Sequence, residues 1–362
     1  MEKFAFIIHP LEIDDIGRKF GPLGYLPAWL QEGFIKMLPP FKVSQITGIR
    51  SEAGNEAEGW FVGCALTAKQ MVTLPEKQVL AKIIRAAKMG AELGAKIVGL
   101  GAFTSVVGDG GITVAKHTPV AVTTGNSYTV YTALEGVRYA AKLLEVEMER
   151  AHVAVIGAGG SIGSACARLL APDVKYMTLV GRNESKLQRV SDLILTESGI
   201  SCKLSTDPNS AIGTADIVIT VTSAVEGVVD ARALKPGAIV CDVARPRDIS
   251  RQVAESRDDV LVFEGGVVKV PGNPDFHFDF GFPAGTSYAC MAETMILALE
   301  GKYENFSLGK ELSLERVRQI GQLAQKHGFK LAGLRSFERA LNEEHILSLR
   351  DRLVPKKASG LA

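Results

Sequence analysis

The chain has 362 residues, 46% of them hydrophobic, and its 41 basic and 40 acidic residues give a formal charge of +1. This length exceeds what one hydrophobic core usually supports, so we expect two domains, and the balanced charge without long blocks of one sign speaks against a nucleic-acid partner. No apolar run reaches the roughly 18 residues of a membrane span, and the N-terminus lacks the apolar length and cleavage site of a signal peptide, which predicts a cytoplasmic protein.

The first part of the chain mixes strands and helices. Apolar runs punctuated by glycine and polar residues predict strands over residues 4–8, 42–49, 59–66 and 96–100. Apolar residues at helical spacing predict an amphipathic helix over 76–93. A strand over 120–127 ends in a turn, where Asn126 or Ser127 is placed to cap a helix that runs to about residue 146.

A different pattern begins at residue 152, where short apolar runs alternate with helical stretches. This alternation predicts a doubly wound parallel sheet of the Rossmann type, with strands over 153–156, 176–180, 216–221, 238–242 and 260–263. Helices over about 286–300 and 313–327 follow, and we expect them to return to the first domain. The fold class is therefore α/β, with a substrate and catalytic α/β domain over 1–150, the Rossmann-type domain over 151–283, and C-terminal helices over 284–362.

A glycine-rich turn follows the first strand of the second domain. Its spacing is GxxGxxG through Gly157, Gly160 and Gly163, between a buried strand and a helix. Such a turn lets backbone N–H groups approach a pyrophosphate, because no Cβ blocks the approach and the helix dipole favours negative charge. A tight turn that binds nothing is the alternative, but the following βα units favour a dinucleotide site. The contacts expected here are Gly157, Gly159, Gly160, Ser161, Ile162 and Gly163.

The end of the next strand indicates which dinucleotide is bound. NAD sites usually carry Asp or Glu there, whereas this chain has Arg182 followed by Asn183. A guanidinium can pair with a 2′-phosphate, so the sequence favours NADP (NADPH), with an ordinary surface arginine as the alternative. Thr222 and Ser223 lie at the carboxyl end of a later strand, where open α/β sheets place ligands. The segment 242–248 follows the next strand and forms either a wall of the nicotinamide pocket or only a salt-bridged loop; Arg245 in this segment is the expected cofactor contact.

The five cysteines are odd in number, dispersed and without CxxC spacing, which predicts reduced thiols and no disulfide framework. Cys290 falls early in a predicted helix, where the dipole favours a thiolate. It is a candidate nucleophile for an acyl group, the alternative being a small buried apolar residue. Cys64 is a second candidate, and Cys166, Cys202 and Cys241 are expected to be structural.

Few other side chains offer proton transfer. His277 lies close to Cys290 in the sequence and is a candidate acid or base, the alternative being a solvated or hydrogen-bonded loop histidine. No spacing of His, Cys and carboxylate residues suggests a metal site, so we expect none.

Several segments, taken in order, resemble the cyanobacterial long-chain acyl-[acyl-carrier-protein] reductases, and the likeness spans nearly the whole chain. The second domain is also similar to the nucleotide domains of glutamyl-tRNA reductase and shikimate dehydrogenase, over 181–183 and 242–248. The chain departs from the reductases over 21–38 and in a segment beyond about residue 330. The segments that carry the resemblance are 101–105, 123–127, the GxxGxxG turn, 265–268, 289–293 with 300–301, 305–307 and 326–329.

The resemblance implies the NADPH-dependent reduction of a fatty acyl thioester to an aldehyde through a cysteine thioester, with Cys290 as the nucleophile. It implies a small-molecule acyl thioester as substrate, carried by acyl carrier protein or by coenzyme A, and it is compatible with a homo-oligomer. The same match places Phe103, Thr104, Ser105, Thr124 and Asn126 on the active-site side of the first domain. The expected catalytic set is Cys290, Thr104, Asn126 and His277.

Two other functions fit the residues. One is an NADP-dependent dehydrogenase of the shikimate or amino-acid type, which has no covalent step and would retain activity after Cys290→Ala. The other is an NADP-binding sensor, which would bind the cofactor without turning over any thioester.

Overall fold

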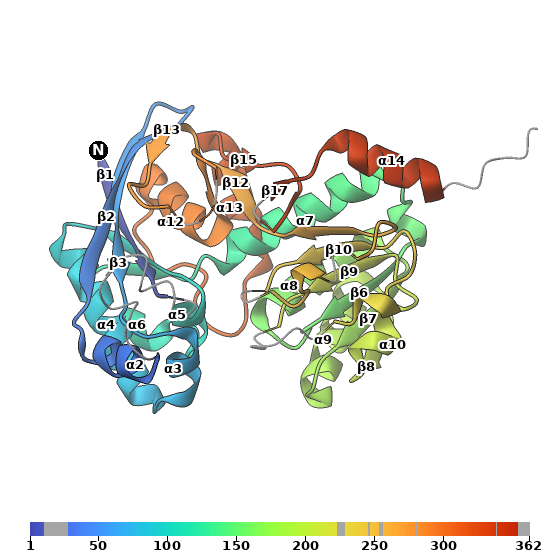
Figure 1. The fold of residues 1–362 in the computed structure, drawn as a ribbon, viewed down its shortest axis with the longest axis horizontal. Coiled ribbons are helices and arrows are strands. Elements are labelled where there is room, and N and C mark those ends of the chain that lie inside the picture. Colours follow the sequence, from blue (N-terminus) through green and yellow to red (C-terminus); the bar gives the residue numbers. More distant parts are fainter. Residues whose placement is uncertain are drawn as a thin grey trace, which may run out of the picture. The chain divides into compact units, whose positions relative to one another are not determined.

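The structure is a computed structural model that describes residues 1–10, 28–222, 229–244, 247–252, 256–279, 281, 283–337 and 339–353. The chain forms two compact units, with elements labelled in Figure 1. Unit 1 comprises Met1–Tyr128 and Val268–Lys330, and unit 2 comprises Thr129–Val267 and Leu331–Ala362. Each unit is described by itself below.

A six-stranded mixed sheet of order β13-β2-β3-β1-β4-β5 forms the centre of unit 1. Strands β1, β3, β4 and β5 are parallel, whereas β2 is antiparallel to β3 and β13 is antiparallel to β2. The residues that follow the four parallel strands therefore gather at one end of the sheet, the carboxyl end of these strands. The strands are β1 (Glu2–Ile8), β2 (Phe41–Arg50), β3 (Glu56–Gly63), β4 (Ile97–Leu100), β5 (Ala121–Thr123) and β13 (Gly272–Asp275).

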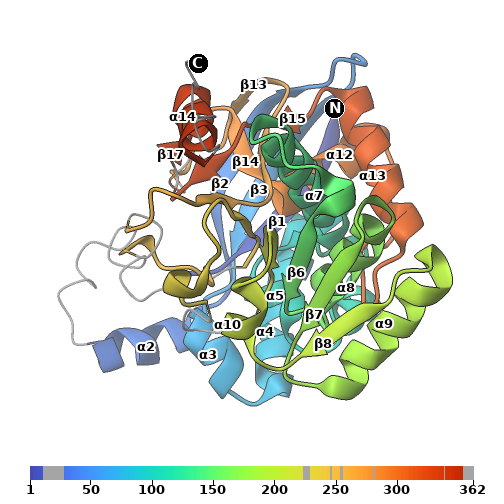
Figure 2. The ribbon, with the colours of Figure 1, turned by 90° about the vertical axis from the view of Figure 1, so that its right-hand side faces the viewer.

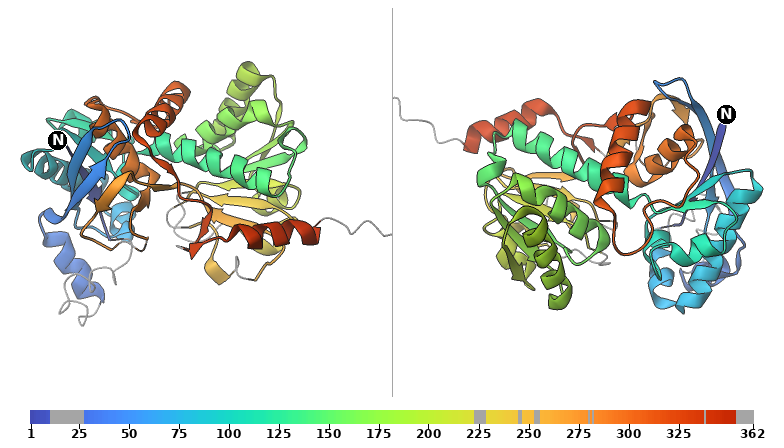
Figure 3. Two further views of the ribbon diagram at one scale, coloured as in Figure 1. Left: turned by 90° about the horizontal axis from the view of Figure 1, so that it is seen from above. Right: turned by 180° about the vertical axis from the view of Figure 1, so that it is seen from behind.

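Two helices cover opposite faces of this sheet. A Cβ added at Gly90 of α4 would meet Ala5 and Val98, whereas one added at Gly99 would meet Thr294 of α12. Since neighbouring residues of a strand point to opposite faces, α4 and α12 lie on different sides. Figure 3 shows α12 and α13 (orange) side by side. The helices of unit 1 are α2 (Ala28–Met37), α3 (Ala68–Thr73), α4 (Glu76–Glu92), α5 (Phe103–Val106), α6 (Ile112–Lys116), α12 (Ala289–Glu300) and α13 (Leu314–His327).

Unit 2 contains a second six-stranded sheet, of order β11-β10-β9-β6-β7-β8, and its strands are all parallel. From β8 this is the Rossmann order 3-2-1-4-5-6, so the expected doubly wound parallel sheet is confirmed. Figure 2 shows α8 and α9 packed together beside β6, β7 and β8. The elements are β6 (His152–Ile156), α8 (Ser161–Leu170), β7 (Tyr176–Val180), α9 (Glu184–Ser198), β8 (Cys202–Ser205), α10 (Pro208–Ile212), β9 (Ile217–Thr220), β10 (Ile239–Asp242) and β11 (Leu261–Glu264).

The units divide the chain at different places from those expected. Helix α7 (Asn126–Leu143) is continuous across the first division, so this division lies inside a helix and not near residue 150, where the sequence placed it. Residues 268–330, which contain α12 and α13, belong to unit 1, whereas residues 331–362 belong to unit 2. The remaining elements are β12 (Val267–Lys269), β14 (Thr286–Tyr288), β15 (Lys330–Leu331), β16 (Arg335–Ser336), β17 (Arg339–Ala340) and α14 (Glu343–Leu353).

Two sequence-based expectations concern the whole chain. Within the described ranges, no helix is both long and apolar enough to cross a membrane. In the same part of the chain, no three His, Cys, Asp or Glu side chains gather in a way that would hold a metal ion. All five cysteines are free thiols.

Candidate functional site

The glycine-rich turn of unit 2 has the backbone that a dinucleotide requires. Gly157 adopts φ +85°, and a Cβ added there would lie 2.2 Å from the carbonyl oxygen of Val221. A Cβ added at Gly163 would lie 2.4 Å from the carbonyl oxygen of Gly157. Only glycine fits at either position, so strand β6, the turn and helix α8 can pack this closely.

Helix α8 begins in this turn and presents its N-terminus to a ligand. Gly160 is the N-cap residue and supplies no side-chain hydrogen bond to the first turn, which contains Ser161, Ile162 and Gly163. The N–H groups of a helix N-terminus and its dipole favour a bound phosphate. The turn and the start of α8 therefore suit the pyrophosphate of a dinucleotide.

The segment after β7 contributes two cations beside the turn. Arg182 is exposed, and Lys186 lies close enough that a Cβ added at Gly159 would be 3.3 Å from the Lys186 Cβ. Asn183 caps helix α9, where its Oδ1 accepts a hydrogen bond of 3.0 Å from the Lys186 amide. Lys186, in the first turn of α9 and four residues after Arg182, was not singled out from the sequence.

The carboxyl ends of β9 and β10 are joined through two buried aspartates. Thr222 donates its backbone amide to Asp248 Oδ2 at 3.0 Å and its hydroxyl to Asp248 Oδ1. Burial raises the pKa of Asp248. Asp242 accepts hydrogen bonds of 3.0 Å from the amides of Ala244 and Ile249. The network fixes the backbone at Thr222, on the edge of the sheet where a dinucleotide binds.

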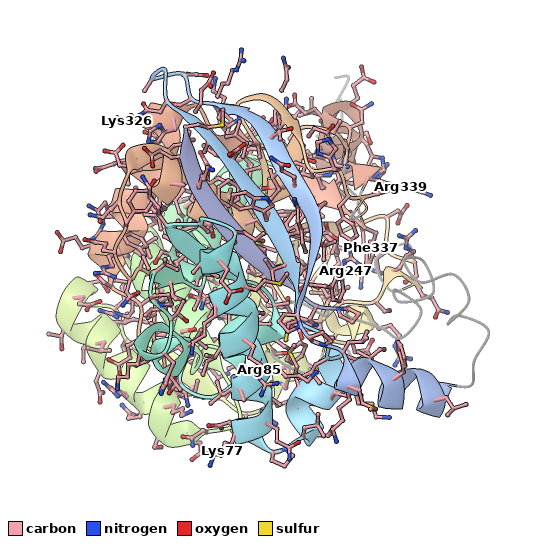
Figure 4. All side chains as sticks on the ribbon, turned by 90° about the vertical axis from the view of Figure 1, so that its left-hand side faces the viewer. Lys77, Arg85, Arg247, Lys326, Phe337 and Arg339 are labelled. Carbon is pink, nitrogen blue, oxygen red and sulfur yellow. The ribbon has the colours of Figure 1, made fainter. Side chains whose placement is uncertain are left out.

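The loop after β10 is partly described. Ser223 and Arg245, both expected to contact the cofactor, lie outside the described residues. Arg247 donates to Glu264 at 2.6 Å and lies over the ring of Phe337, 4.9 Å from its centroid. Figure 4 labels Arg247 and Phe337. The salt-bridged arrangement left open by the sequence is therefore present at Arg247.

Cys290 lies in unit 1 as the second residue of α12, immediately after β14. Its side chain is half-buried. Cys290 therefore lies in the first turn of a helix, the position that was expected from the sequence.

Gly125 is in direct contact with Cys290. A Cβ added at Gly125 would lie 2.3 Å from the Cα and 2.4 Å from the Cβ of Cys290, and Gly125 adopts φ +75°. The turn at the end of β5 and the start of α12 are therefore in backbone contact, although they are more than 160 residues apart in the sequence.

The other cysteines are poor nucleophiles. Burial raises the pKa of Cys64 and of Cys166 to about 12, and that of Cys202 to about 11. Cys241 is buried. A thiol with so high a pKa is protonated at neutral pH, which makes Cys64 a weak candidate nucleophile.

Thr104 and Asn126 follow neighbouring parallel strands, β4 and β5. Thr104 is buried, and its hydroxyl donates to the Gly101 carbonyl oxygen at 2.7 Å within a turn where Ala102 has φ +46°. Asn126 is the half-buried first residue of α7, next to Gly125. Both residues therefore follow the carboxyl ends of their strands, at the same end of the sheet as the contact between Gly125 and Cys290.

The first turn of α7 takes hydrogen-bond partners from a distant segment. The Ser127 amide donates to the Ser307 hydroxyl at 3.2 Å, and the Tyr128 amide donates to Glu293 Oε2 at 2.8 Å. We expected Asn126 or Ser127 to supply the cap, but these two donors are satisfied through tertiary contacts. Sequence reasoning also missed Glu293, because a glutamate within an apolar helix has no local signature.

His277 is not brought to Cys290 in the described structure. It follows β13, where its ring is 52% exposed and its Nδ1 lies 3.0 Å from the Gln45 carbonyl oxygen. Strand β13 is at one edge of the sheet and β5 at the other. Five inter-strand steps of about 4.8 Å separate the two edge strands by roughly 24 Å. A direct role for His277 in chemistry at Cys290 has no support from this placement.

Three comparisons place the chain among known proteins. A family model described as Shikimate / quinate 5-dehydrogenase matches residues 138–264. The chain is 29% identical to a long-chain acyl-[acyl-carrier-protein] reductase of Synechococcus elongatus, over 90% of this chain and 98% of that protein. The predicted resemblance to these reductases is confirmed. The nucleotide-binding domain of glutamyl-tRNA reductase from Thermoplasma volcanium is 23% identical, covering 38% of this chain and 84% of that chain, with a TM-score of 0.25.

A second relative is much longer than this chain. The aminotransferase PigE of a Serratia strain is 32% identical over 96% of this chain, but the chain spans only 42% of the length of PigE. The match therefore relates this chain to one part of that protein.

Proposed function

We propose that the chain is an NADPH-dependent reductase that converts an acyl thioester to an aldehyde through a thioester on Cys290. The observation that carries the proposal is that Cys290 lies in the first turn of α12, in contact with Gly125. A residue larger than glycine at position 125 would overlap Cys290. The similarity to a long-chain acyl-[acyl-carrier-protein] reductase along almost all of both proteins supports the same activity.

The covalent step uses groups of unit 1. The Cys290 thiolate attacks the carbonyl carbon of the thioester, a new S–C bond forms, and the bond to the carrier sulfur breaks. The carrier leaves as a thiolate and takes up a proton from water. The N–H groups at the start of α12 and the Asn126 amide are suited to stabilise the oxyanion of the tetrahedral intermediate.

The reduction requires the nucleotide site of unit 2. Gly157, Gly160 and the first turn of α8 would hold the pyrophosphate, and Arg182 with Lys186 would pair with the 2′-phosphate, which favours NADPH over NADH. NADPH supplies the hydride for the acyl carbonyl carbon and leaves as NADP⁺. Loss of the Cys290 sulfur from that carbon then releases the aldehyde and regenerates the thiolate.

We propose a long-chain acyl group as substrate, on acyl carrier protein or coenzyme A, because the reductase that matches end to end is named for such a substrate. The aminotransferase activity named for PigE is not proposed for this chain, since the match covers less than half of PigE.

The proposal is tested by intact-protein mass spectrometry after mixing with hexadecanoyl-CoA in the absence of NADPH, beside Cys290→Ala. An acyl adduct on the parent alone, discharged as hexadecanal when NADPH is added, is the expected result. Aldehyde or alcohol formation with full activity in Cys290→Ala would point to the non-covalent dehydrogenase. NADPH binding with no adduct and no turnover, across chain lengths and carriers, would point to a sensor.

A further inference from the structure

The carboxyl group of Glu293 is completely buried and lies on α12 three residues after Cys290. Its Oε1 accepts a hydrogen bond from the Thr123 hydroxyl, and its Oε2 accepts one of 2.8 Å from the Tyr128 amide. The Gly125 amide also hydrogen-bonds to this carboxyl group, and the Ser307 hydroxyl, which donates to the Ser127 hydroxyl at 2.6 Å, lies beside it. Residues three apart on a helix are neighbours on its surface, so this cluster lies beside Cys290.

A buried carboxyl group is expensive unless donors satisfy it, and the groups around this one are all neutral. Burial raises the pKa of Glu293, while the neighbouring Thr123, Ser307, Tyr128 and Gly125 oppose that rise. Packing alone would be served as well by an apolar side chain of similar volume. The carboxyl group therefore has a use that packing does not explain.

The donors Thr123, Gly125 and Tyr128 all come from one short stretch, residues 123–128. This stretch contains Gly125, which contacts Cys290, and it contains the start of α7. The Tyr128 amide in α7 donates a hydrogen bond to Glu293. Ser307 also hydrogen-bonds to this stretch, because its Oγ accepts from the Ser127 amide and its carbonyl oxygen accepts from the Thr124 hydroxyl. The carboxyl group thus ties the stretch that lies on Cys290 to the helix that carries Cys290.

We propose that Glu293 is a positioning residue that holds residues 123–128 against Cys290, so that the first turn of α7 stays beside the thiol and stabilises its ionised form. Glu293 acts through that stretch and does not itself contact the substrate. The effect on catalysis rests on the proposed reductase function, whereas the effect on the thiol does not.

The test uses the full-length chain and four variants. Glu293→Gln keeps the size of the side chain but replaces one acceptor oxygen by a donor, and Thr123→Val keeps the shape of Thr123 but removes its hydroxyl. Thr123→Ser retains the hydroxyl and is the conservative rescue. Thr178→Val removes a buried hydroxyl of unit 2, bonded to His152 at 2.8 Å, and is the matched control.

The first measurement is the pH dependence of Cys290 alkylation by iodoacetamide, followed by intact mass, with Cys290→Ala as the background. Loss of the stretch from the thiol is expected to raise the inflection pH by about one unit in Glu293→Gln, with a smaller rise in Thr123→Val. Thr123→Ser and Thr178→Val should match the parent. Removing a negative charge alone would lower the inflection pH in Glu293→Gln, so a fall or no change in both test variants overturns the proposal.

The second measurement is the rate constant of acyl-adduct formation with hexadecanoyl-CoA. It is expected to fall by about 10-fold or more in Glu293→Gln, with NADPH affinity unchanged. If the parent forms no adduct, the reductase proposal fails while the alkylation profile still decides the role of Glu293. Thermal unfolding of every variant separates lost folding from lost positioning, and Thr123→Val keeps the test open if Glu293→Gln does not fold.

Discussion

The nucleotide turn of unit 2 and the Cys290 site of unit 1 are assembled from the chain in different ways. The turn is made by consecutive residues between β6 and α8, and its glycines meet the backbone of Val221 and of the turn itself. The Cys290 site joins residues 123–128 to α12, and the Thr123–Glu293 hydrogen bond links positions 170 residues apart. A site of the first kind depends on local backbone geometry, whereas the second kind depends on tertiary contacts that must all form together.

The largest expected effect is that of Gly125→Ala, which tests the second kind of site. The added Cβ would overlap the Cα and Cβ of Cys290, so we expect acylation by hexadecanoyl-CoA to fall by about 100-fold or more with NADPH affinity retained. Gly54→Ala is the matched control, because Gly54 has φ +88° and nothing within 4 Å of an added Cβ. Equal losses in the two variants would mean that backbone strain alone, and not contact with Cys290, matters.

The same comparison applies to the nucleotide turn. Gly157→Ala places a Cβ 2.2 Å from the Val221 carbonyl oxygen, and we expect NADPH affinity, measured by fluorescence titration, to fall by about 30- to 100-fold. Iodoacetamide alkylation of Cys290 should be unchanged. Gly199→Ala, at φ +75° with open space around it, is the control within unit 2. NADPH affinity equal to that of the parent would remove this turn from the nucleotide site.

A smaller effect is expected at the residues proposed to select the dinucleotide. Arg182→Ala should weaken NADPH binding by about 10-fold and leave NADH binding nearly unchanged, because only NADPH has the 2′-phosphate. Lys186→Ala should act in the same direction. Arg189→Ala, on the same helix as Lys186, is the control. Equal losses for both dinucleotides in Arg182→Ala would assign the guanidinium to another part of the cofactor.

The smallest effect concerns stability in unit 1, at a buried histidine of α13. His327 Nδ1 lies 2.7 Å from Ser51 Oγ and its Nε2 lies 2.9 Å from Glu300 Oε2, while Lys326 also pairs with Glu300. Burial lowers the pKa of His327, although Glu300 opposes the shift. The unfolded chain therefore binds this proton more readily, so stability is full above about pH 6.5 and falls as the pH drops below it.

We expect His327→Gln to cost about 1–2 kcal/mol at pH 7.5 and to flatten the loss of thermal stability between pH 7 and pH 5.5. The pKa of Glu300 is also lowered, and its contribution would be lost only below about pH 4.5, outside this window. Thermal melts of the parent and the variant across the window check this. Parallel curves would show that His327 does not titrate there.

The difference between the two sites also explains what the sequence could predict. The parallel sheet of unit 2 was predictable from the alternation of strands and helices, which is a local pattern. The glycine turn and Arg182 are also local patterns. The helical stripe of α4 was predictable for the same reason. Cys290 was recognised through the resemblance to a family, because its position in a helix N-terminus alone did not distinguish it from a buried structural thiol.

The features that were missed have no local pattern. His277 is near Cys290 in the sequence, but β13 pairs at the β2 edge of the sheet, and only strand pairing determines that. Glu293 and Ser307 replace the expected helix cap because their donors and acceptors meet only in the folded unit. The division of the chain inside α7 was also unpredictable, since a continuous helix carries no break in its periodicity.

The division of the chain into units has a consequence for synthesis on the ribosome. Strands β1 to β5 emerge first, but α12, which covers one face of their sheet, is made only after all six strands of the unit 2 sheet. One apolar face of the nascent unit 1 sheet therefore remains without its covering helix α12 while more than 160 further residues are translated. Truncation before α12 should leave a chain that aggregates or recruits chaperones, and Cys290 arrives together with the helix that completes the fold.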